Sequence, residues 1–165
     1  MTALAQMLAT VFGVGNMRPA PGTWGSAAAL PLLWALHTAG GFTLVVIATL
    51  AVFFVGIWAT GEVTRATGNH DPSEVVIDEV VGQWIALWPV SLGAGFMGID
   101  VLRLWPGWVA GFVLFRLFDI WKPGLVGRAD RRNDAVGVML DDVHAGIFAA
   151  LCTAALAFLF HGVLT

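Results

Sequence analysis

The sequence predicts an all-α protein, a compact polytopic membrane helical bundle with about four or five spanning or partly spanning helices and an N-terminal interfacial helix. The first observation behind this prediction is composition: 58% of the 165 residues are hydrophobic and only 12% are charged, and the mean hydropathy is +0.83. A soluble domain of this composition would be short of polar surface. Each membrane crossing needs roughly 20 apolar residues, so we expect residues 1–165 to form a single domain.

The second observation is the distribution of charge. Seventeen of the nineteen charged residues lie in three segments: around Arg18, from Glu62 to Glu79, and from Arg116 to Asp142. Long uncharged stretches separate these segments. Helices over the uncharged stretches would cross the membrane in pairs and return all three charged segments to the same face. The pattern therefore predicts a polar site assembled at one membrane face.

The N-terminal half predicts one short helix and two longer ones. Residues 1–13 are typical of a short interfacial helix, and the Gly, Asn and Pro residues of 13–25 predict a loop. Residues 26–39 are apolar but number only fourteen, so this segment crosses tilted or enters only part of the way. Gly40-Gly41 predicts a turn, and residues 42–60 are the clearest spanning helix.

The C-terminal half predicts three further helices. Residues 80–99 cross again, interrupted by a proline and several glycines, and residues 101–118 return. Asp100 and Arg103 mark the turn between them. The last helix is expected from residue 143 to about residue 164, with its end on the opposite face.

Orientation follows from the basic residues. Seven of the eight lie in the charged segments, and Arg103 alone lies on the other side. Because cytoplasmic loops contain the excess of Lys and Arg, the charged face is expected to be cytoplasmic. Ten of the eleven carboxylates share that face, so it is not simply a basic anchor for anionic lipid.

Two acidic pairs mark the expected helix starts. Asp78-Glu79 precedes Gly82, and Asp141-Asp142 precedes Gly146, so in each case a carboxylate lies four residues before a glycine. On a helix this spacing places the small residue directly below the acid, where another helix or a ligand can approach closely. We therefore expect the two helices to meet at these glycines.

Paired carboxylates near hydrocarbon indicate a bound cation. An intramembrane charge costs about 2.5–3.5 kcal/mol on insertion scales, and facing carboxylates repel one another. A divalent ion would remove both penalties, and a ligand set of oxygens without clustered Cys or His favours Mg²⁺ over zinc. The simpler alternative is that acids at a helix start favour the helix dipole. Two pairs together with Asp119 favour the metal.

Basic residues lie between the two acidic pairs. Arg116 and Lys122 flank Asp119, and Arg131 and Arg132 follow. An arginine fork binds phosphate oxygens bidentately and a lysine supplies a point charge, so these cations beside a metal site suit a phosphate ester. The alternative is a cytoplasmic anchor. The segment 18–26 offers backbone amides and hydroxyls for an anion, but alone this signal is weak and a structural turn is the preferred interpretation.

Four ordered motifs resemble the phosphatidylglycerophosphatase A family over residues 10–150. They are Pro21-Gly22-Thr23-Trp24-Gly25, Ile77-Asp78-Glu79-Val80-Val81-Gly82, Phe115-Arg116-Leu117-Phe118-Asp119-Ile120-Trp121-Lys122-Pro123 and Gly137-Val138-Met139-Leu140-Asp141-Asp142. The resemblance implies a Mg²⁺-dependent enzyme of the bacterial inner membrane that hydrolyses phosphatidylglycerophosphate to phosphatidylglycerol and inorganic phosphate. Residues 133–136 depart from the family, which is often richer in glycine there.

The resemblance also implies roles for individual residues. Glu79, Asp141 and Asp142 would hold the metal, and Asp78 and Asp119 would complete the site or orient the attacking water. The residues expected to bind the terminal phosphate are Thr23, Arg116, Lys122, Arg131 and Arg132, and Lys122 also belongs to the expected catalytic set. The expected partners are this lipid and the bilayer, with no nucleic acid. The sequence does not indicate an oligomeric state.

Alternatives stay open at this stage. The nucleophile is water or Asp119, with water preferred. A different class of function is a small transporter that uses intramembrane carboxylates for Mg²⁺ or protons, and its acids should lie at mid-bilayer. A head-group phosphotransferase of the CDP-alcohol type would need an aspartate motif that this chain lacks.

Overall fold

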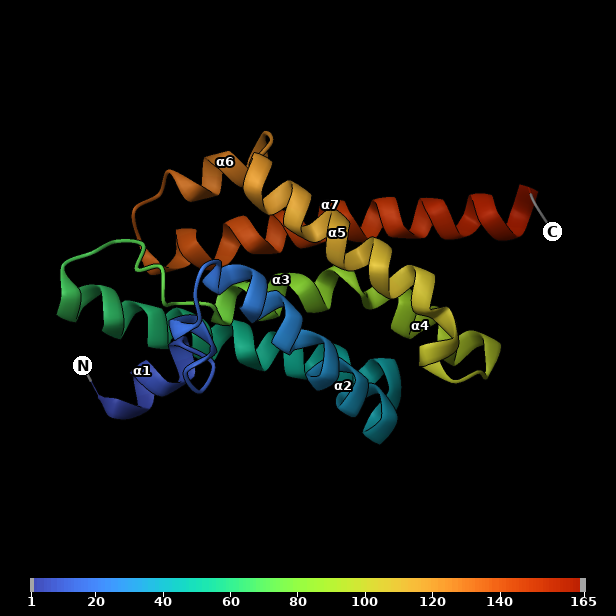
Figure 1. The fold of residues 1–165 in the computed structure, drawn as a ribbon, viewed down its shortest axis with the longest axis horizontal. Helices are drawn as coiled ribbons and strands as arrows, with labels where there is room; N and C mark the ends of the chain where they lie inside the picture. The colour runs from blue at the N-terminus through green and yellow to red at the C-terminus, as the bar shows by residue number, and fades with distance from the viewer. Residues whose placement is uncertain (1, 164–165) are drawn as a thin grey trace.

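The computed structural model describes residues 2–163, with side chains described to residue 160. The protein is all-α, as predicted. In chain order its elements are α1 (Ala3–Ala9), the 3₁₀ turn η1 (Val14–Asn16), α2 (Pro21–Thr67), α3 (Ile77–Ala86), α4 (Trp88–Met97), the 3₁₀ turn η2 (Val101–Leu104), α5 (Trp105–Trp121), α6 (Leu125–Asp130) and α7 (Ala135–Val163) (Figure 1). The expected end of the last helix at residue 164 lies outside the described part.

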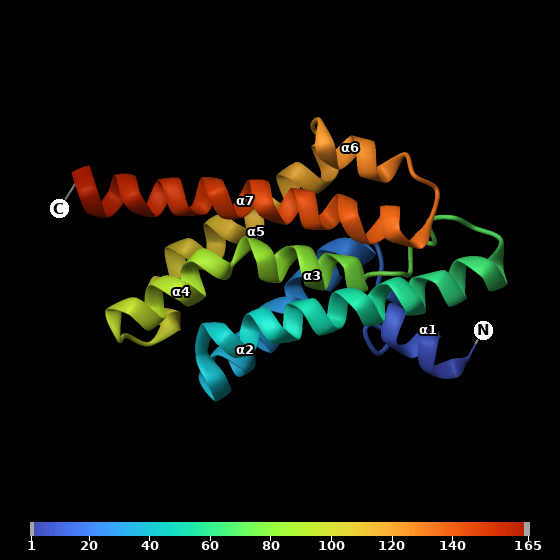
Figure 2. The same cartoon turned by 180° about the vertical axis from the view of Figure 1, so that it is seen from behind.

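Helix α2 is folded back on itself. Gly40 and Gly41 have non-helical backbone angles, with φ of 63° at Gly41, and the chain reverses there (Figures 1 and 2). This is the predicted turn. The predicted loop over 13–25 is wrong at its end, because the helix already begins at Pro21, and proline is favoured in a first helical turn. The arm over residues 21–39 is therefore about 28 Å long, close to the thickness of the hydrocarbon core.

The protein is a multi-pass membrane protein. Three segments are long and apolar enough to span: α2, Val101–Trp121 and Ala135–Phe160. Helices α3 and α4 make a fourth if they are taken as one span bent by 42°. The bend lies next to the proline that was expected to interrupt residues 80–99. The described residues thus hold three or four candidate spans.

Helix α3 lies at the centre of the bundle, and nine of its ten residues are buried. It meets α5 and α7 at Gly82. A methyl group on Gly82 would approach the Phe115 ring at 2.5 Å and the Asp142 carbonyl oxygen at 2.6 Å, and one on Gly146 would overlap the Gly82 backbone. The predicted close approach at the two glycines is confirmed.

Helix α7 begins eight residues earlier than predicted. Asp134 precedes its first residue, Ala135, and the Asp134 carboxylate accepts a hydrogen bond from the Gly137 amide at 2.6 Å, which caps the helix. Asp141 and Asp142 therefore lie in its second turn rather than before it. The uncharged stretch is a poor guide to this start because Asp141 and Asp142, which line the cavity, interrupt an apolar run that already begins at Ala135.

The ends of the helices bring the charged segments together. The starts of α3 and α7, the end of α5 and all of α6 lie at one end of the bundle, and α4 and the C-terminal part of α7 extend to the other (Figure 1). Helix α1 packs at the first end, where Ala5 and Ala9 are fully buried in a cluster with Ala59 and Val63 of α2. This arrangement assembles the polar site.

Candidate functional site

A cavity of about 290 Å³ lies at the charged end of the bundle. Its walls come from the start of α2, the first turn of α3, the end of α5, the loops around α6 and the second turn of α7. The structure brings all six residues expected to be catalytic to this cavity: Asp78, Glu79, Asp119, Lys122, Asp141 and Asp142. Segments far apart in the chain, from Ala20 at the start of α2 to Asp142 in α7, therefore build one site.

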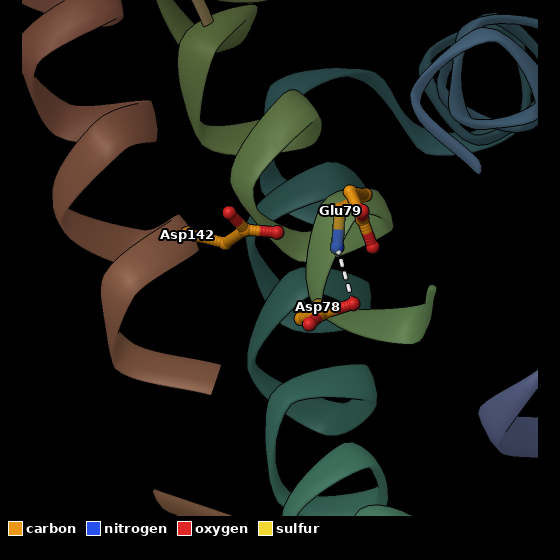
Figure 3. A group of neighbouring side chains, drawn as sticks. All are labelled: Asp78, Glu79 and Asp142. Atoms are coloured by element: carbon orange, nitrogen blue, oxygen red, sulfur yellow. Dashed lines mark hydrogen bonds between the residues drawn. The ribbon is translucent and has the colours of Figure 1, made fainter. Parts of the chain in front are cut away.

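Asp78 and Glu79 occupy the first turn of α3. One Asp78 carboxylate oxygen accepts a hydrogen bond from the Glu79 amide at 2.9 Å (Figure 3). The unpaired amides and the dipole at a helix N-terminus stabilise negative charge at this position. The local sequence thus fixes the backbone of the first pair while the Glu79 carboxylate stays free to face the cavity.

Asp141 and Asp142 face these acids from α7. Asp141 Oδ1 accepts a hydrogen bond from the Asp142 amide at 3.0 Å, and Asp142 is only 2% exposed. Figure 3 shows the Asp142 side chain pointing from α7 toward Asp78 and Glu79. The carboxylates form two groups whose ligand atoms lie within 4.8 Å of one another: Asp78, Glu79 and Asp142 in one, and Asp119, Asp141 and Asp142 in the other.

Arg116 joins three helices at the cavity wall. Its Nη1 lies 2.8 Å from Asp119 Oδ2 and 3.9 Å from Glu79 Oε1. The same nitrogen donates to Ser26 Oγ at 3.4 Å, and Ser26 donates to the Gly22 carbonyl at 2.9 Å. A single guanidinium therefore holds one carboxylate of α5 and one of α3 against the start of α2.

Lys122 plays the corresponding role for α7. It ends α5 in the left-handed conformation, with φ of 50°. Its ammonium lies 3.0 Å from Asp141 Oδ2 and also pairs with Asp130. Burial opposes the charged form, but the hydrogen bonds to Asp130 and Asp141 outweigh it and raise the pKa of Lys122 above its ordinary value. Lys122 is a permanent cation at physiological pH.

The first motif contributes mainly close packing. A methyl group on Gly22 would overlap the Glu79 carboxylate and come within 3.2 Å of Arg116 Nη1, so only glycine lets α2 start this close to the acids. Thr23 is half-buried and is not among the residues that line the cavity. The motif lies on a helix rather than in the expected loop.

The two arginines after α6 also lie away from the cavity. Arg131 and Arg132 are exposed and do not line it. Arg132 forms two hydrogen bonds to Asp134, at 3.2 and 3.0 Å. Of the five residues expected to bind phosphate, the structure brings Arg116 and Lys122 to the acids. A phosphate-binding role for Thr23, Arg131 and Arg132 stays a prediction.

Sequence reasoning missed several residues of the site. Ser26 supports Arg116, Asp130 pairs with Lys122, and His70, Ser73 and Asn133 line the cavity. Asp130 lies in the same charged segment as Lys122, which was the one available signal for it. The other contacts depend on how the loops fold over the helix ends.

The donor set fits a hard divalent cation. All the converging ligands are carboxylate oxygens, which Mg²⁺ prefers. Within the described residues, Glu79 Oε2 and Arg116 Nε are buried without a hydrogen-bond partner. A buried carboxylate oxygen left unpaired is costly, and a metal ion would satisfy it. The buried acidic groups could therefore bind a metal.

The site combines buried carboxylates able to hold a cation with an arginine and a lysine, at one end of a membrane bundle. This combination is typical of a membrane enzyme that acts on phosphate esters. Comparison with known families agrees with this class. The chain belongs to the phosphatidylglycerophosphatase A family, whose family model matches residues 7–157. It is a lipid phosphomonoesterase of that family.

Three curated relatives cover most of the chain. A Bacteroides thetaiotaomicron protein provisionally named phosphatidylinositol-3-phosphatase is 38% identical over 155 residues, which is 92% of each chain. The phosphatidylglycerophosphatase A of Escherichia coli is 33% identical over 87% of this chain and 78% of its own. That of Haemophilus influenzae is 36% identical over 92% of this chain and 88% of its own. No solved structure matches.

Proposed function

We propose that this protein hydrolyses phosphatidylglycerophosphate to phosphatidylglycerol and inorganic phosphate, with Mg²⁺, at the cytoplasmic face of a bacterial inner membrane. The observation that supports this most is the convergence of carboxylates from α3, α5 and α7 on one cavity beside Arg116 and Lys122. The two relatives named phosphatidylglycerophosphatase A support the choice of substrate.

In this proposal, Glu79, Asp141, Asp142 and Asp78 hold the metal. A Mg²⁺ ion held there would neutralise the charge that develops on the phosphoryl oxygens during displacement. The protein supplies the fixed positions. Lys122 holds the Asp141 carboxylate at 3.0 Å, whereas Arg116 lies 3.9 Å from Glu79 and attracts it without a hydrogen bond. Asp141 is therefore fixed in place, and the Glu79 carboxylate can turn toward a cation.

Arg116 and Lys122 also balance the charge of the substrate. The lipid must bring an anionic phosphate to a wall rich in carboxylates, and these are the basic side chains that line the cavity. Remaining N–H donors on either group can hydrogen-bond to phosphate oxygens. We assign them to the terminal phosphate, where attraction to the cations offsets repulsion from the acids.

Asp119 is proposed to orient the attacking water. Its Oδ2 is held by Arg116 at 2.8 Å, which fixes the carboxylate so that its other oxygen can accept a hydrogen bond from water. The water oxygen forms a bond to phosphorus as the ester P–O bond breaks, and the proton that the water loses passes to the released glycerol oxygen. The same side chain is the alternative nucleophile if water is not used.

A second candidate substrate is phosphatidylinositol 3-phosphate, favoured by the Bacteroides thetaiotaomicron relative. The chemistry is the same, because both lipids present a phosphomonoester. The transporter alternative is disfavoured by position. Asp78 and Glu79 lie in the first turn of α3, and Asp141 and Asp142 lie in the second turn of α7, rather than halfway along a span.

The test is phosphate release by the purified protein in detergent. Phosphatidylglycerophosphate, phosphatidylinositol 3-phosphate and phosphatidic acid are compared, each with Mg²⁺ and with a chelator. We expect the fastest release from phosphatidylglycerophosphate and none after chelation. Faster release from the inositol lipid would reassign the substrate, and full activity without metal would remove the role given to Mg²⁺. Ion flux into proteoliposomes without phosphate release would favour a transporter.

A further inference from the structure

The two acidic groups of the cavity share one residue. Asp142 belongs to the group with Asp78 and Glu79 and also to the group with Asp119 and Asp141. Its side chain is almost completely buried and points toward the first group (Figure 3). Among the described residues no N–H group donates a hydrogen bond to its carboxylate, and its side-chain partner is another carboxyl group, that of Asp119. Buried carboxyl groups that face one another require a shared proton or a cation.

One divalent cation leaves the cavity strongly negative. Seven acidic and two basic side chains line it, so its formal charge is −5 with every group ionised. One divalent ion brings this to −3 and a second brings it to −1. The proposed substrate is itself an anion, and a phosphate ester is not drawn into a site with a charge of −3. Charge balance therefore favours two ions.

The two groups are neutralised to different degrees by the protein itself. Asp119 is 2.8 Å from Arg116, and Asp141 is 3.0 Å from Lys122. Among the described residues, the group with Asp78 and Glu79 has only the weaker Arg116 contact at 3.9 Å. Because nearby cations repel a metal ion, the group at the start of α3 should bind its ion more tightly.

We propose that the cavity holds two divalent cations, a tighter one on Asp78 and Glu79 and a weaker one on Asp119 and Asp141, with the Asp142 carboxylate shared between them. The inference rests on the proposed function and deepens it by assigning the number of ions and their ligands, and it replaces the water-orienting role given to Asp119 above with a role as a metal ligand. Sites of this kind place the ions about 3.5–4 Å apart and stabilise both the attacking and the leaving oxygen. The shared carboxylate sets the spacing.

The experiment uses Mn²⁺ alone as a paramagnetic probe of the purified full chain in detergent. Equilibrium binding should give two Mn²⁺ per chain, the second weaker, and the electron paramagnetic resonance spectrum should show a spin-coupled pair at saturation. Asp119→Asn should lose the weaker ion and the coupled signal while it keeps the tighter ion. Asp142→Asn should lose the coupled signal and weaken both ions.

Controls keep the result interpretable. Glu62 lies outside the cavity and pairs with Arg65 at 2.5 Å, so Glu62→Gln should still bind a coupled pair. Far-UV circular dichroism checks the fold of each variant, and Asp141→Asn replaces Asp119→Asn if the latter is unfolded. A single Mn²⁺ per wild-type chain would overturn the inference, as would a coupled pair that survives Asp142→Asn.

The outcome separates this inference from the proposed function. If one ion binds and lipid phosphate is still hydrolysed, the proposed function stands and the second ion is refuted. If a coupled pair binds but none of the lipid phosphates is hydrolysed, the ion assignment stands and the proposed function is refuted. Phosphate release is therefore measured on the same preparations.

Discussion

At the scale of single residues, the site depends on carboxylates that are fixed by neighbours from other helices. Glu79 illustrates this. Its oxygen Oε1 faces Arg116 at 3.9 Å, and the other oxygen is buried without a partner among the described residues. The absence of a side chain at Gly22 makes room for it. Glu79 is thus placed by packing and held ready for a cation.

Glu79→Gln should abolish turnover and leave the protein folded. The amide has the same shape as the carboxylate but lacks the negative charge that a divalent ion requires. Loss of one charge-stabilising group at a reacting centre typically slows catalysis by about 10²-fold or more. Phosphate release measures the effect, and thermal unfolding in detergent checks the fold. Glu62→Gln is the matched control. Near-normal release by Glu79→Gln would refute the assignment.

The sequence was informative about the identity of the acids and less so about their partners. Four acids could be identified because placing an ionised side chain beside an apolar membrane stretch costs free energy, so such residues are usually functional. They are Asp78, Glu79, Asp141 and Asp142. The pairing of Lys122 with Asp141 and Asp130 could not be predicted, since it depends on a left-handed residue at the end of α5. Loop geometry of this kind leaves no periodic pattern in the sequence from which the contact could be predicted.

At the scale of helices, the crossing of α3 and α7 sets the position of the site. Gly82 and Gly146 allow the two backbones to touch, and each lies four residues after an acid, so one contact aligns both acidic pairs. Small residues at membrane helix contacts favour association because lipid gives helices no hydrophobic reason to pack. The crossing is thus a structural requirement of the site.

Gly146→Ala should destabilise the protein. The added methyl group would overlap the Gly82 carbonyl and lie 3.1 Å from its Cα, and backbone at a helix crossing cannot yield easily. Overpacking of this kind costs about 1–3 kcal/mol. Thermal unfolding in detergent measures the change. Gly95→Ala on α4 is the control, since a methyl group there meets nothing within 4 Å. Equal stability of the two variants would contradict the proposed tight crossing.

Helix boundaries were predicted less well than helix number. Charge-free stretches located the spans, but α2 and α7 each begin several residues before their apolar stretch. In α2 the early residues include Pro21 and Gly22, which line the cavity. In α7 the first six residues are apolar, and the charges of Asp141 and Asp142 at the cavity interrupt the uncharged stretch. A charge can therefore mark a cavity-facing position inside a membrane helix rather than the start of the helix. The glycine break in α2 was predictable because two adjacent glycines disfavour a continuous helix.

At the scale of the whole molecule, folding gathers the charge at one end. The cavity, α6 and the ends of the charged segments lie together, and Arg103 lies beyond the far end of α4 in η2 (Figure 1). A lipid phosphatase needs this polarity, because the phosphate stays at the membrane surface while the acyl chains stay in the bilayer. The distribution of charge thus supports both the proposed orientation of the protein and the proposed position of its chemistry.

Orientation is testable by labelling single cysteines in cells. Cys152 is the only cysteine, so Cys152→Ala provides a background for Arg65→Cys and Arg103→Cys. Both positions are exposed. A cytoplasmic site follows from the excess of basic residues on its side. A maleimide that cannot cross membranes should therefore label Arg103→Cys in intact cells and Arg65→Cys only after permeabilisation. Retained phosphate release confirms that each variant is folded, and the reverse labelling pattern would place the active site on the outer face.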